Sequence, residues 1–277
     1  MLEWDDRSSL RGANEAIRRR ISWCAFQNGE ITESRSASTL TVRATPLRGV
    51  YADGTYLEQN PTWHEEDSPW KAAQIRLMLQ KHPLQIQSVA EIGCGVGAIL
   101  AELCQTLPRD VECHGFDIAP EAIAGAKQRE NDQLHFHLQD LLSADAFFDL
   151  LLVMDVVEHV PDYFGFLEGC RRKARFKLYH IPLDIHVSSV IRASFVRGRI
   201  SVGHIHYFTA ESALATLTDT GHKIVDWFYT DGGLGLASLH PSLQRTLANV
   251  PRRLISLVST AWAARLLGGY SLMILTE

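Results

Sequence analysis

The segment 89–97, Val-Ala-Glu-Ile-Gly-Cys-Gly-Val-Gly, combines an acidic residue with three closely spaced glycines. Glu91 precedes Gly93 by two positions, and Gly95 and Gly97 follow at alternate positions. A glycine-rich loop between a strand and a helix lets the backbone approach a ligand closely. The first N–H groups of the following helix also point at that ligand. The segment therefore predicts a ligand-binding loop.

Two classes of cofactor are bound by loops of this kind. A dinucleotide loop follows the pattern GxGxxG or GxGxxA, which Gly93, Gly95 and Ala98 satisfy loosely. An S-adenosylmethionine loop has an acidic residue followed by x-Gly-x-Gly-x-Gly, and Glu91 begins such a run. Asp117 ends the next apolar stretch, where its two oxygens can accept hydrogen bonds from both ribose hydroxyls in either class. A plain tight turn for the glycines and a helix cap for Asp117 are the structural alternatives.

Strands and helices alternate from about residue 66 onward, and several strands are continuous apolar runs, as in sheets covered on both faces. We therefore predict an α/β fold, a Rossmann-like, seven-stranded, mostly parallel sheet with helices on both faces and an antiparallel last strand beside the fifth. The predicted strands are 87–92, 111–116, 134–138, 147–154, 175–181, 223–229 and 270–276, and the predicted helices are 97–106, 120–129, 162–172, 209–219 and 241–266.

The domain boundaries follow from where this alternation begins. Residues 1–65 are interpreted as an N-terminal extension or lid, with a helix around 10–20 and a strand around 38–44. Residues 66–277 form the α/β domain, beginning with a helix capped by Ser68 with Pro69 at its first position. Within that domain, residues 183–208 are a long insertion between the fifth strand and the next helix.

Composition limits the class of protein. The chain has 277 residues and a net charge of -5, without a basic run that would favour nucleic-acid binding. Its five cysteines include no CxxC pair, which favours a reduced, cytoplasmic protein. The apolar segment 254–276 is interrupted by Arg265 and by Gly268 and Gly269. We interpret it as an amphipathic helix, a glycine stop and a buried strand, so no stable membrane insertion is expected.

Two further segments extend the motif. Leu138-Gln139-Asp140-Leu141 follows the third strand, and Asp155-Val156-Val157-Glu158-His159 follows the fourth. With the glycine loop and Asp117, these residues resemble the small-molecule class I S-adenosylmethionine-dependent methyltransferases, in particular the ubiquinone-biosynthesis group, from about Trp70 to Glu277. The resemblance implies S-adenosylmethionine as cofactor and methyl transfer to a small molecule, with oxygen as the expected acceptor atom and nitrogen and carbon as open alternatives. The insertion 183–208 is where such enzymes commonly bind the acceptor.

The same resemblance implies a role for each matching residue. Glu91 would lie near the methionine amino group, and Asp117 would bind the ribose with Ile118 packed on the adenine. Asp140 would accept a hydrogen bond from the adenine amino group, although an ordinary turn aspartate is an alternative. Lys71 could pair with the methionine carboxylate, or the aromatic segment around it could simply pack. The full expected cofactor set is Glu91, Gly93, Cys94, Gly95, Asp117, Ile118, Asp140, Leu141, Met154, Asp155 and Lys71.

Histidines supply the candidate catalytic groups. Transfer of a methyl group from a sulfonium requires the protein to position two reactants and to exclude water. A hydroxyl acceptor also needs a base, and histidine suits that role near neutral pH. His159 follows the fourth strand, where the active cleft opens in this fold, and His180 ends the fifth strand. The other two candidates, His204 and His206, lie in the insertion. We select His159, His204 and His206 as catalytic candidates, although a structural role is the alternative for each.

Three other possibilities remain open at the level of sequence. In the ubiquinone-type enzymes an acid-x-x-Glu-His run can hold a divalent metal, and Asp155, Glu158 and His159 have this spacing, with Asp as the first acid. Because many relatives with these residues are metal-free, we predict no metal. An NAD-dependent oxidoreductase is disfavoured by Glu91, by Gly97 and by the absence of a Tyr-x-x-x-Lys pair. A non-catalytic cofactor-binding module would share every motif above.

Overall fold

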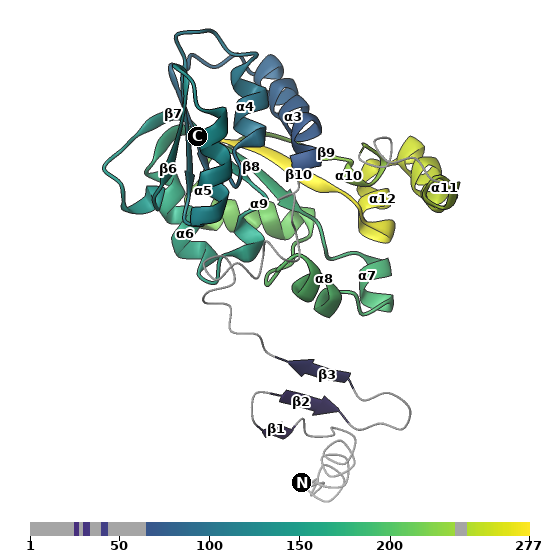
Figure 1. The fold of residues 1–277 in the computed structure, drawn as a ribbon. Helices are drawn as coiled ribbons and strands as arrows, with labels where there is room; N and C mark the ends of the chain where they lie inside the picture. Colours follow the sequence, from purple (N-terminus) through teal and green to yellow (C-terminus); the bar gives the residue numbers. More distant parts are fainter. Residues whose placement is uncertain (1–24, 28–29, 34–39, 44–64, 236–242) are drawn as a thin grey trace, which may run out of the picture. The chain divides into compact units, whose positions relative to one another are not determined.

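The computed structural model describes residues 25–27, 30–33, 40–43, 65–235 and 243–277. The chain divides into two compact units, residues 1–48 and residues 49–277. In the first unit, three short antiparallel strands pair in chain order (Figure 1): β1 (Ala25–Gln27), β2 (Glu30–Glu33) and β3 (Leu40–Arg43). The last of these falls within the strand predicted at 38–44, whereas the helix predicted at 10–20 lies outside the described residues. The interpretation of residues 1–65 as a lid stays a prediction.

The second unit is built around a seven-stranded sheet with the order β6-β5-β4-β7-β8-β10-β9. The strands β4, β5, β6, β7 and β8 are mutually parallel, and β10 runs antiparallel to both of its neighbours. The predicted fold class is thereby confirmed. The strand bounds are β4 (Ser88–Ile92), β5 (Glu112–Asp117), β6 (Leu134–Leu138), β7 (Phe148–Met154), β8 (Ala174–Pro182), β9 (Ile224–Thr230) and β10 (Ser271–Thr276).

Helices cover both faces of this sheet (Figure 1). On one face, α3 (Ser68–Lys81), α4 (Ala98–Cys104) and α5 (Pro120–Ala126) contribute to one apolar core. On the other face, α6 (Tyr163–Arg171), α9 (Ala210–Asp219) and α12 (Thr260–Leu267) contribute to a second core. Because successive side chains of a strand point to opposite faces, Leu150 and Leu152 of β7 enter the first core, whereas Leu151 and Val153 enter the second. This explains why the strands read as continuous apolar runs.

Four short 3-10 helices lie in the segments that connect the longer elements. They are η1 (Glu65–Asp67), η2 (Lys127–Arg129), η3 (Leu141–Ser143) and η4 (Val157–His159). Of these, η3 directly follows β6 and η4 directly follows β7. Both therefore lie at the carboxyl edge of the sheet, the edge at which open α/β sheets bind their ligands.

Three local features differ from the sequence-based prediction. Helix α3 begins at Ser68 with Asp67 in the N-cap position, one residue earlier than predicted. The predicted helix 241–266 is two helices, α11 (Leu243–Val258) and α12, because Ser259 breaks the run and caps α12 by accepting from the amide of Trp262. The insertion 183–208 contains two unpredicted short helices, α7 (Val187–Ile191) and α8 (Phe195–Ser201), and a single turn, α10 (Gly232–Gly235), follows β9.

Apart from the break at Ser259, the C-terminal apolar segment folds as predicted. Helix α12 ends at Gly268 and Gly269, both with positive φ, and the chain then enters the buried strand β10. Among the residues that the structure describes, none of the helices combines the length and hydrophobicity needed to cross a membrane.

Candidate cofactor and acceptor site

The glycine loop connects β4 to α4 at the carboxyl edge of the sheet. Gly93, Gly95 and Gly97 have φ angles of +68°, +54° and +75°, which side chains rarely allow. A Cβ at Gly97 would also lie 2.3 Å from ring carbons of Phe136. The backbone conformation of the predicted turn therefore requires glycine at these positions. Within the turn, the amides of Gly93 and Cys94 donate to the Phe116 carbonyl, and the amide of Gly97 donates to the Cys94 carbonyl.

Asp117 ties this loop to the end of β5. One of its carboxylate oxygens accepts from the amide of Gly95 at 2.8 Å, and the other accepts from the amide of Ala119 at 2.9 Å. Helix α5 has Ala119 as its N-cap and receives no side-chain cap, so Asp117 does not take the helix-cap role considered for it and instead joins the glycine loop to the turn before α5. Each oxygen retains a second lone pair that can accept from a ribose hydroxyl.

Glu91 is buried in β4 below the loop, with 1% of its surface exposed. Its Oε2 atom has no hydrogen-bond partner. Burial raises the pKa of this carboxyl to about 8, and the positive charge of Lys71 acts in the opposite direction. A buried carboxylate oxygen without a donor is suited to a cationic ligand group, such as an ammonium.

The neighbouring ends of β5 and β6 expose apolar side chains. Ile118 is 65% exposed and Leu138 is 54% exposed, which is unusual for large hydrophobic residues that follow a buried strand. Asp140 lies next to them and accepts from the amide of Leu142 at 2.9 Å, so the turn role considered for it is present. Leu141 is fully buried. The adenine contacts predicted for Ile118 and Asp140 stay a prediction.

Cys94 and Met154 are buried beside the loop. The Cys94 thiol lies 3.7 Å from the carbonyl oxygen of Gly95, so its own side chain stays within the loop. Met154 ends β7 and is 5% exposed. The orphaned Glu91 oxygen, the positive-φ glycines and the exposed Ile118 side chain have the chemistry that the predicted methionine, backbone and adenine contacts need, and these roles stay predictions.

A polar network starts where β7 ends. Asp155 has a positive φ of 54°, a strained conformation for a residue other than glycine. Its carboxylate pairs with Lys71 Nζ at 2.8 Å and with His180 Nδ1 at 2.6 Å. His180 Nε2 in turn lies 2.8 Å from the Thr230 hydroxyl. The positive charges of His180 and Lys71 keep the pKa of Asp155 below its usual range despite its burial. Lys71 and Asp155, predicted separately as cofactor residues, are thus partners of one another.

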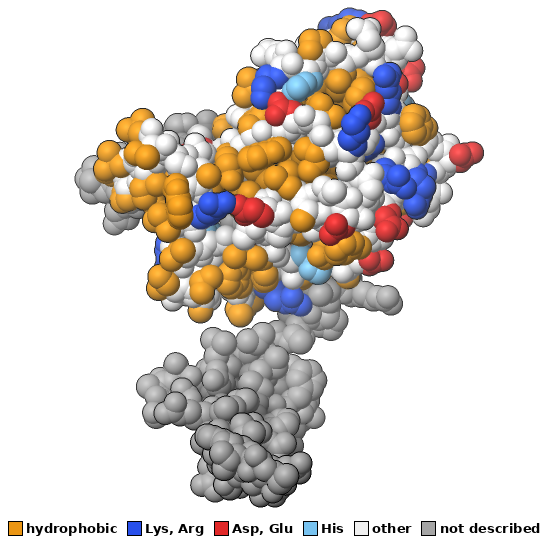
Figure 2. Space-filling model, turned by 180° about the vertical axis from the view of Figure 1, so that it is seen from behind, with side chains coloured by type: hydrophobic (Ala, Val, Ile, Leu, Met, Phe, Trp, Pro, Cys, Tyr) orange, Lys and Arg blue, Asp and Glu red, His pale blue; other side chains and the backbone are white. Residues whose placement is uncertain are grey.

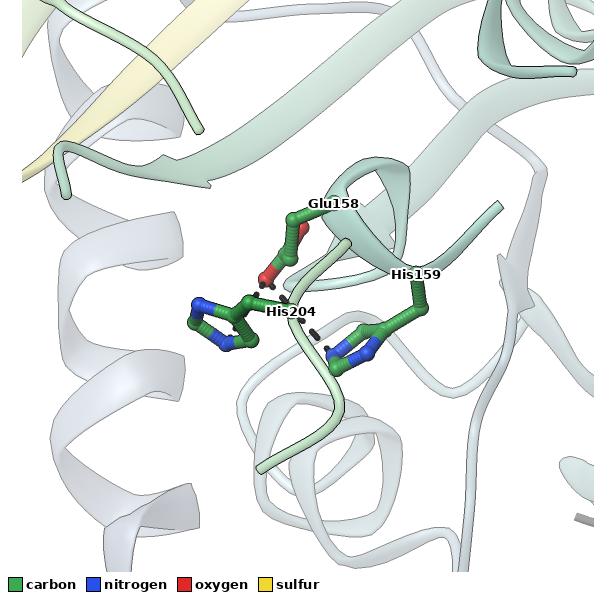
Figure 3. A group of neighbouring side chains, drawn as sticks. All are labelled: Glu158, His159 and His204. Carbon is green, nitrogen blue, oxygen red and sulfur yellow. Dashed lines mark ion pairs between the residues drawn. The ribbon is translucent and has the colours of Figure 1, made fainter. Parts of the chain in front are cut away.

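A second cluster lies one turn further along the chain, in η4 and in the insertion (Figure 3). Glu158 is fully buried, and neither of its carboxylate oxygens has a hydrogen-bond partner. His159 and His204 approach the same atom, because the Nε2 of each lies 3.9 Å from Glu158 Oε1. The backbone closes the insertion against η4, since the amides of Ile205 and His206 donate to the Glu158 carbonyl at 2.9 and 3.1 Å.

The outer nitrogens of both imidazoles are held by oxygen atoms. His204 Nδ1 lies 2.6 Å from Asp184 Oδ2, and His159 Nδ1 lies 3.1 Å from the Gly203 carbonyl. A carbonyl oxygen only accepts, so the His159 proton resides on Nδ1 and its Nε2 carries a lone pair. Burial lowers the pKa of His159 to about 4, with His204 contributing in the same direction. His159 is therefore neutral at pH 7.

The structure separates the three catalytic candidates. His159 and His204 form a pair with ring centroids 5.0 Å apart. The ring of His206 instead packs on Tyr163 at 4.5 Å, and its Nε2 is buried without a partner. Sequence reasoning gave no role to Asp184 or Thr230. The only local signal for Asp184 is its place at the start of the insertion, and nothing near Thr230 indicates its approach to His180.

Comparison with known proteins agrees with this geometry. A family model described as "Methyltransferase domain" matches residues 90–175. A ubiquinone biosynthesis O-methyltransferase of Cereibacter sphaeroides is 37% identical over 95 residues, 32% of this chain and 37% of the relative, so the match spans little more than a third of that relative. A probable S-adenosylmethionine-dependent methyltransferase of Mycolicibacterium smegmatis is 26% identical over 204 residues, covering 69% of this chain and 77% of the relative.

Solved structures with the same fold include two methyltransferases of low sequence identity. The N-methyltransferase NodS of Bradyrhizobium japonicum has a TM-score of 0.51 at 18% identity, covering 81% of this chain and 98% of NodS. A methyltransferase of Archaeoglobus fulgidus has a TM-score of 0.50 at 20% identity, covering 74% and 93%. Sheet order, the glycine loop and the methyltransferase match over residues 90–175 together support a class I S-adenosylmethionine-dependent methyltransferase, with S-adenosylmethionine as its cofactor.

Proposed function

We propose that this protein transfers the methyl group of S-adenosylmethionine to an oxygen atom of a small-molecule acceptor. The observation that carries the proposal is the position of the His159–His204 pair. It follows β7, which is parallel to and adjacent to β4, so the pair and the glycine loop lie at the same edge of the sheet. An acceptor held at the pair would lie next to a cofactor held at the loop.

The cofactor end is assigned to residues whose chemistry suits each part of the ligand. Glu91 would bind the ammonium, with Lys71 and Asp155 near the methionine end. Asp117 would bind the ribose hydroxyls. The remaining members of the set, which line the methionine, ribose and adenine, are Gly93, Cys94, Gly95, Ile118, Asp140, Leu141 and Met154. When bound, the cofactor supplies an activated methyl group on a sulfonium, so the protein contributes mainly orientation and exclusion of water.

The acceptor end must deal with the proton of a hydroxyl group. His204 is oriented by Asp184, as a base is oriented by a carboxylate in other hydrolytic and transfer sites. His159 is neutral, and its Nε2 lies beside Glu158 Oε1, as the Nε2 of His204 does. His204 is therefore the preferred base, whereas the lowered pKa of His159 makes it a weaker proton acceptor and favours a hydrogen-bonding role toward the acceptor. His206 packs beneath Tyr163, which favours a positioning role for it over direct contact with the acceptor.

Exposed apolar side chains support a small, partly apolar acceptor. Helix α7 of the insertion exposes Val187, Val190 and Ile191, and hydrophobic side chains also gather on the neighbouring C-terminal helices (Figure 2). Apolar groups that remain in water next to a polar cluster often mark a ligand surface. A cytoplasmic location is part of the proposal and is supported by Cys94, Cys104, Cys113 and Cys170, all free and buried.

The test is formation of S-adenosylhomocysteine over a panel of phenols, hydroxy acids, alcohols and amines. We expect turnover with one hydroxyl class, and a large fall in kcat for His204→Gln with unchanged affinity for S-adenosylhomocysteine. His135→Gln, on β6 and outside the cluster, is the matched control and should retain full activity. Cofactor binding without turnover across the whole panel would favour a non-catalytic module. Turnover with amines alone would contradict the oxygen assignment.

A further inference from the structure

The second half of helix α11 presents apolar side chains to solvent. Leu257 and Val258 are 83% and 89% exposed, more than any other large hydrophobic residues that the structure describes. Leu254, which is also exposed, precedes them by three and four positions, so the three side chains share one face of the helix. On the opposite side, Ile255 packs against the core and the Arg252 guanidinium lies beside Gly269. An arginine is thus turned inward and an apolar stripe outward, the reverse of an ordinary surface helix.

Helices α12 and α7 continue this exposed surface. Trp262 of α12 is exposed, and the Arg265 guanidinium lies 5.7 Å from the centre of its ring. Helix α7 packs beside α12, where the Ser188 hydroxyl donates to the Leu267 carbonyl at 3.3 Å. Hydrophobic side chains accordingly gather over these helices (Figure 2). We call this surface the apolar face, and its exposed side chains are Val190, Ile191, Leu254, Leu257, Val258 and Trp262.

The two segments that carry the apolar face are basic. Residues 185–208 contain three arginines and residues 232–276 contain four, whereas neither segment contains an aspartate or a glutamate. All 32 acidic residues therefore lie elsewhere in a chain whose net charge is -5. Arg192, Arg197 and Arg253 are exposed, and none of the three forms an ion pair with a residue that the structure describes. Positive charge without a partner in the described part of the chain therefore accompanies the apolar side chains.

We propose that the apolar face binds the surface of an anionic lipid bilayer. A helix with an outward apolar side and flanking arginines lies in the plane of the membrane interface, where the apolar side chains enter the acyl boundary and the arginines meet the headgroups. Tryptophan is favoured at that interface, and Trp262 lies on this face. Such binding is peripheral and needs no helix that spans the membrane.

Charge decides between a bilayer and other occupants of the face. Contact with a second copy through a two-fold axis would bring the same arginines against one another, which is unfavourable. Residues 1–48 contain eight arginines and six acidic residues, so their charge does not complement the face. A nucleic acid would match the arginines and leave Leu257 and Val258 without an apolar partner. An anionic bilayer supplies both the opposite charge and the apolar phase.

The inference goes beyond the proposed methyl transfer. The apolar face lies outside residues 90–175, which the methyltransferase family model matches. It is carried mainly by α11 and α12, and it borders the predicted acceptor site only through α7 of the insertion. Binding to vesicles is measured without cofactor and without acceptor, so the experiment below can fail while the methyltransferase assignment stands.

The test is co-sedimentation of the full chain with vesicles of phosphatidylcholine alone and with vesicles of phosphatidylcholine and phosphatidylglycerol in equal amounts. We expect binding to the mixed vesicles, at least ~10-fold weaker binding to phosphatidylcholine alone, and weaker binding to both as the two arginine-dependent terms are screened by about 0.5 M NaCl. The double substitution Leu257→Ser with Val258→Ser should weaken binding to the mixed vesicles at least ~10-fold, because it removes the most exposed apolar area. Arg253→Gln should weaken binding to the mixed vesicles and leave binding to phosphatidylcholine unchanged.

Phe147→Ser and Arg109→Gln are the matched controls, because both side chains are exposed and lie outside the apolar face, and both variants should bind as the wild type does. All replaced side chains are exposed, so the denaturation midpoint should be the same in every variant. The inference is overturned if the wild type binds neither kind of vesicle or binds both equally. It is also overturned if the double variant, with an unchanged midpoint, binds as tightly as the wild type. Dimerisation of the wild type that is lost in the double variant would overturn it too, since a second copy would then cover the face.

Discussion

Replacing Asp117 by alanine tests the assignment of the ribose site. In the folded chain its two oxygens already hold the amides of Gly95 and Ala119. The substitution leaves both amides without their acceptor, which costs about 2–4 kcal/mol of unfolding free energy. It also removes the acceptors for two ribose hydroxyls, each worth about 1.5–3 kcal/mol when the acceptor is charged. The dissociation constant of S-adenosylhomocysteine should rise at least ~100-fold, which corresponds to about 3 kcal/mol.

Asp149→Ala separates loss of stability from loss of binding. Asp149 likewise accepts from two backbone amides, those of Gln87 and Ser88, at 2.7 and 3.1 Å, but at the amino end of β4, away from the site. We expect a comparable fall in the denaturation midpoint for both variants and a change in affinity for Asp117→Ala alone. Calorimetric titration and urea denaturation measure the two quantities.

A deoxy ligand distinguishes direct contact from loop distortion. If Asp117 binds the ribose, removal of the 2′-hydroxyl from S-adenosylhomocysteine weakens binding to the wild type roughly 10- to 150-fold. In Asp117→Ala the same removal should have almost no effect, because the partner is already gone. Equal sensitivity of both proteins to the deoxy ligand would refute the direct contact, even if the alanine variant binds weakly.

Three further predictions concern the glycine loop, the buried Glu91 and the ion pair of Asp226 on β9. Gly97→Ala would place a Cβ 2.3 Å from the Phe136 ring at a φ of +75°, so its unfolding free energy should be lower than that of the wild type by more than about 2 kcal/mol. Gly198→Ala is the control, because a Cβ there meets no atom within 4 Å, and its unfolding free energy should not fall. Because the pKa of Glu91 is raised to about 8, this carboxyl is protonated at pH 7 and should release close to one proton when the ammonium of the ligand binds. The measured binding enthalpy should therefore depend on the ionisation enthalpy of the buffer. In Glu91→Gln that dependence should disappear. Asp226, whose pKa is lowered to about 2 chiefly by its bond from the Lys81 side chain, stabilises the fold only when ionised. Asp226→Asn should therefore cost up to about 1 kcal/mol at pH 7, and denaturation curves should show this difference narrowing as the pH falls from about 4 toward 2.

The parts of the site that could be predicted from sequence depend on local pattern. Glu91, the three glycines and Asp117 lie at strand ends, and parallel strands bring their carboxyl ends to one edge. The strands could be predicted because each contains an apolar run that is recognised from neighbouring residues alone. Each prediction needed only neighbours along the chain.

The rest depends on contacts between segments far apart in sequence. His204 meets Glu158 only because the insertion folds back and its amides bond to the Glu158 carbonyl. The Thr230 hydroxyl reaches His180 across the sheet from β9. The helices α7 and α8 are too short to show helical periodicity, and the break at Ser259 is a single capping residue within an apolar run.

The central claim is that the glycine loop holds S-adenosylmethionine and not a dinucleotide. Calorimetric titration of the purified wild-type chain with S-adenosylhomocysteine, and separately with NAD, tests it most directly. We expect one S-adenosylhomocysteine bound per chain and no heat of binding with NAD. Binding of NAD in place of S-adenosylhomocysteine, or of neither ligand, would contradict the assignment of the loop and of the site built on it.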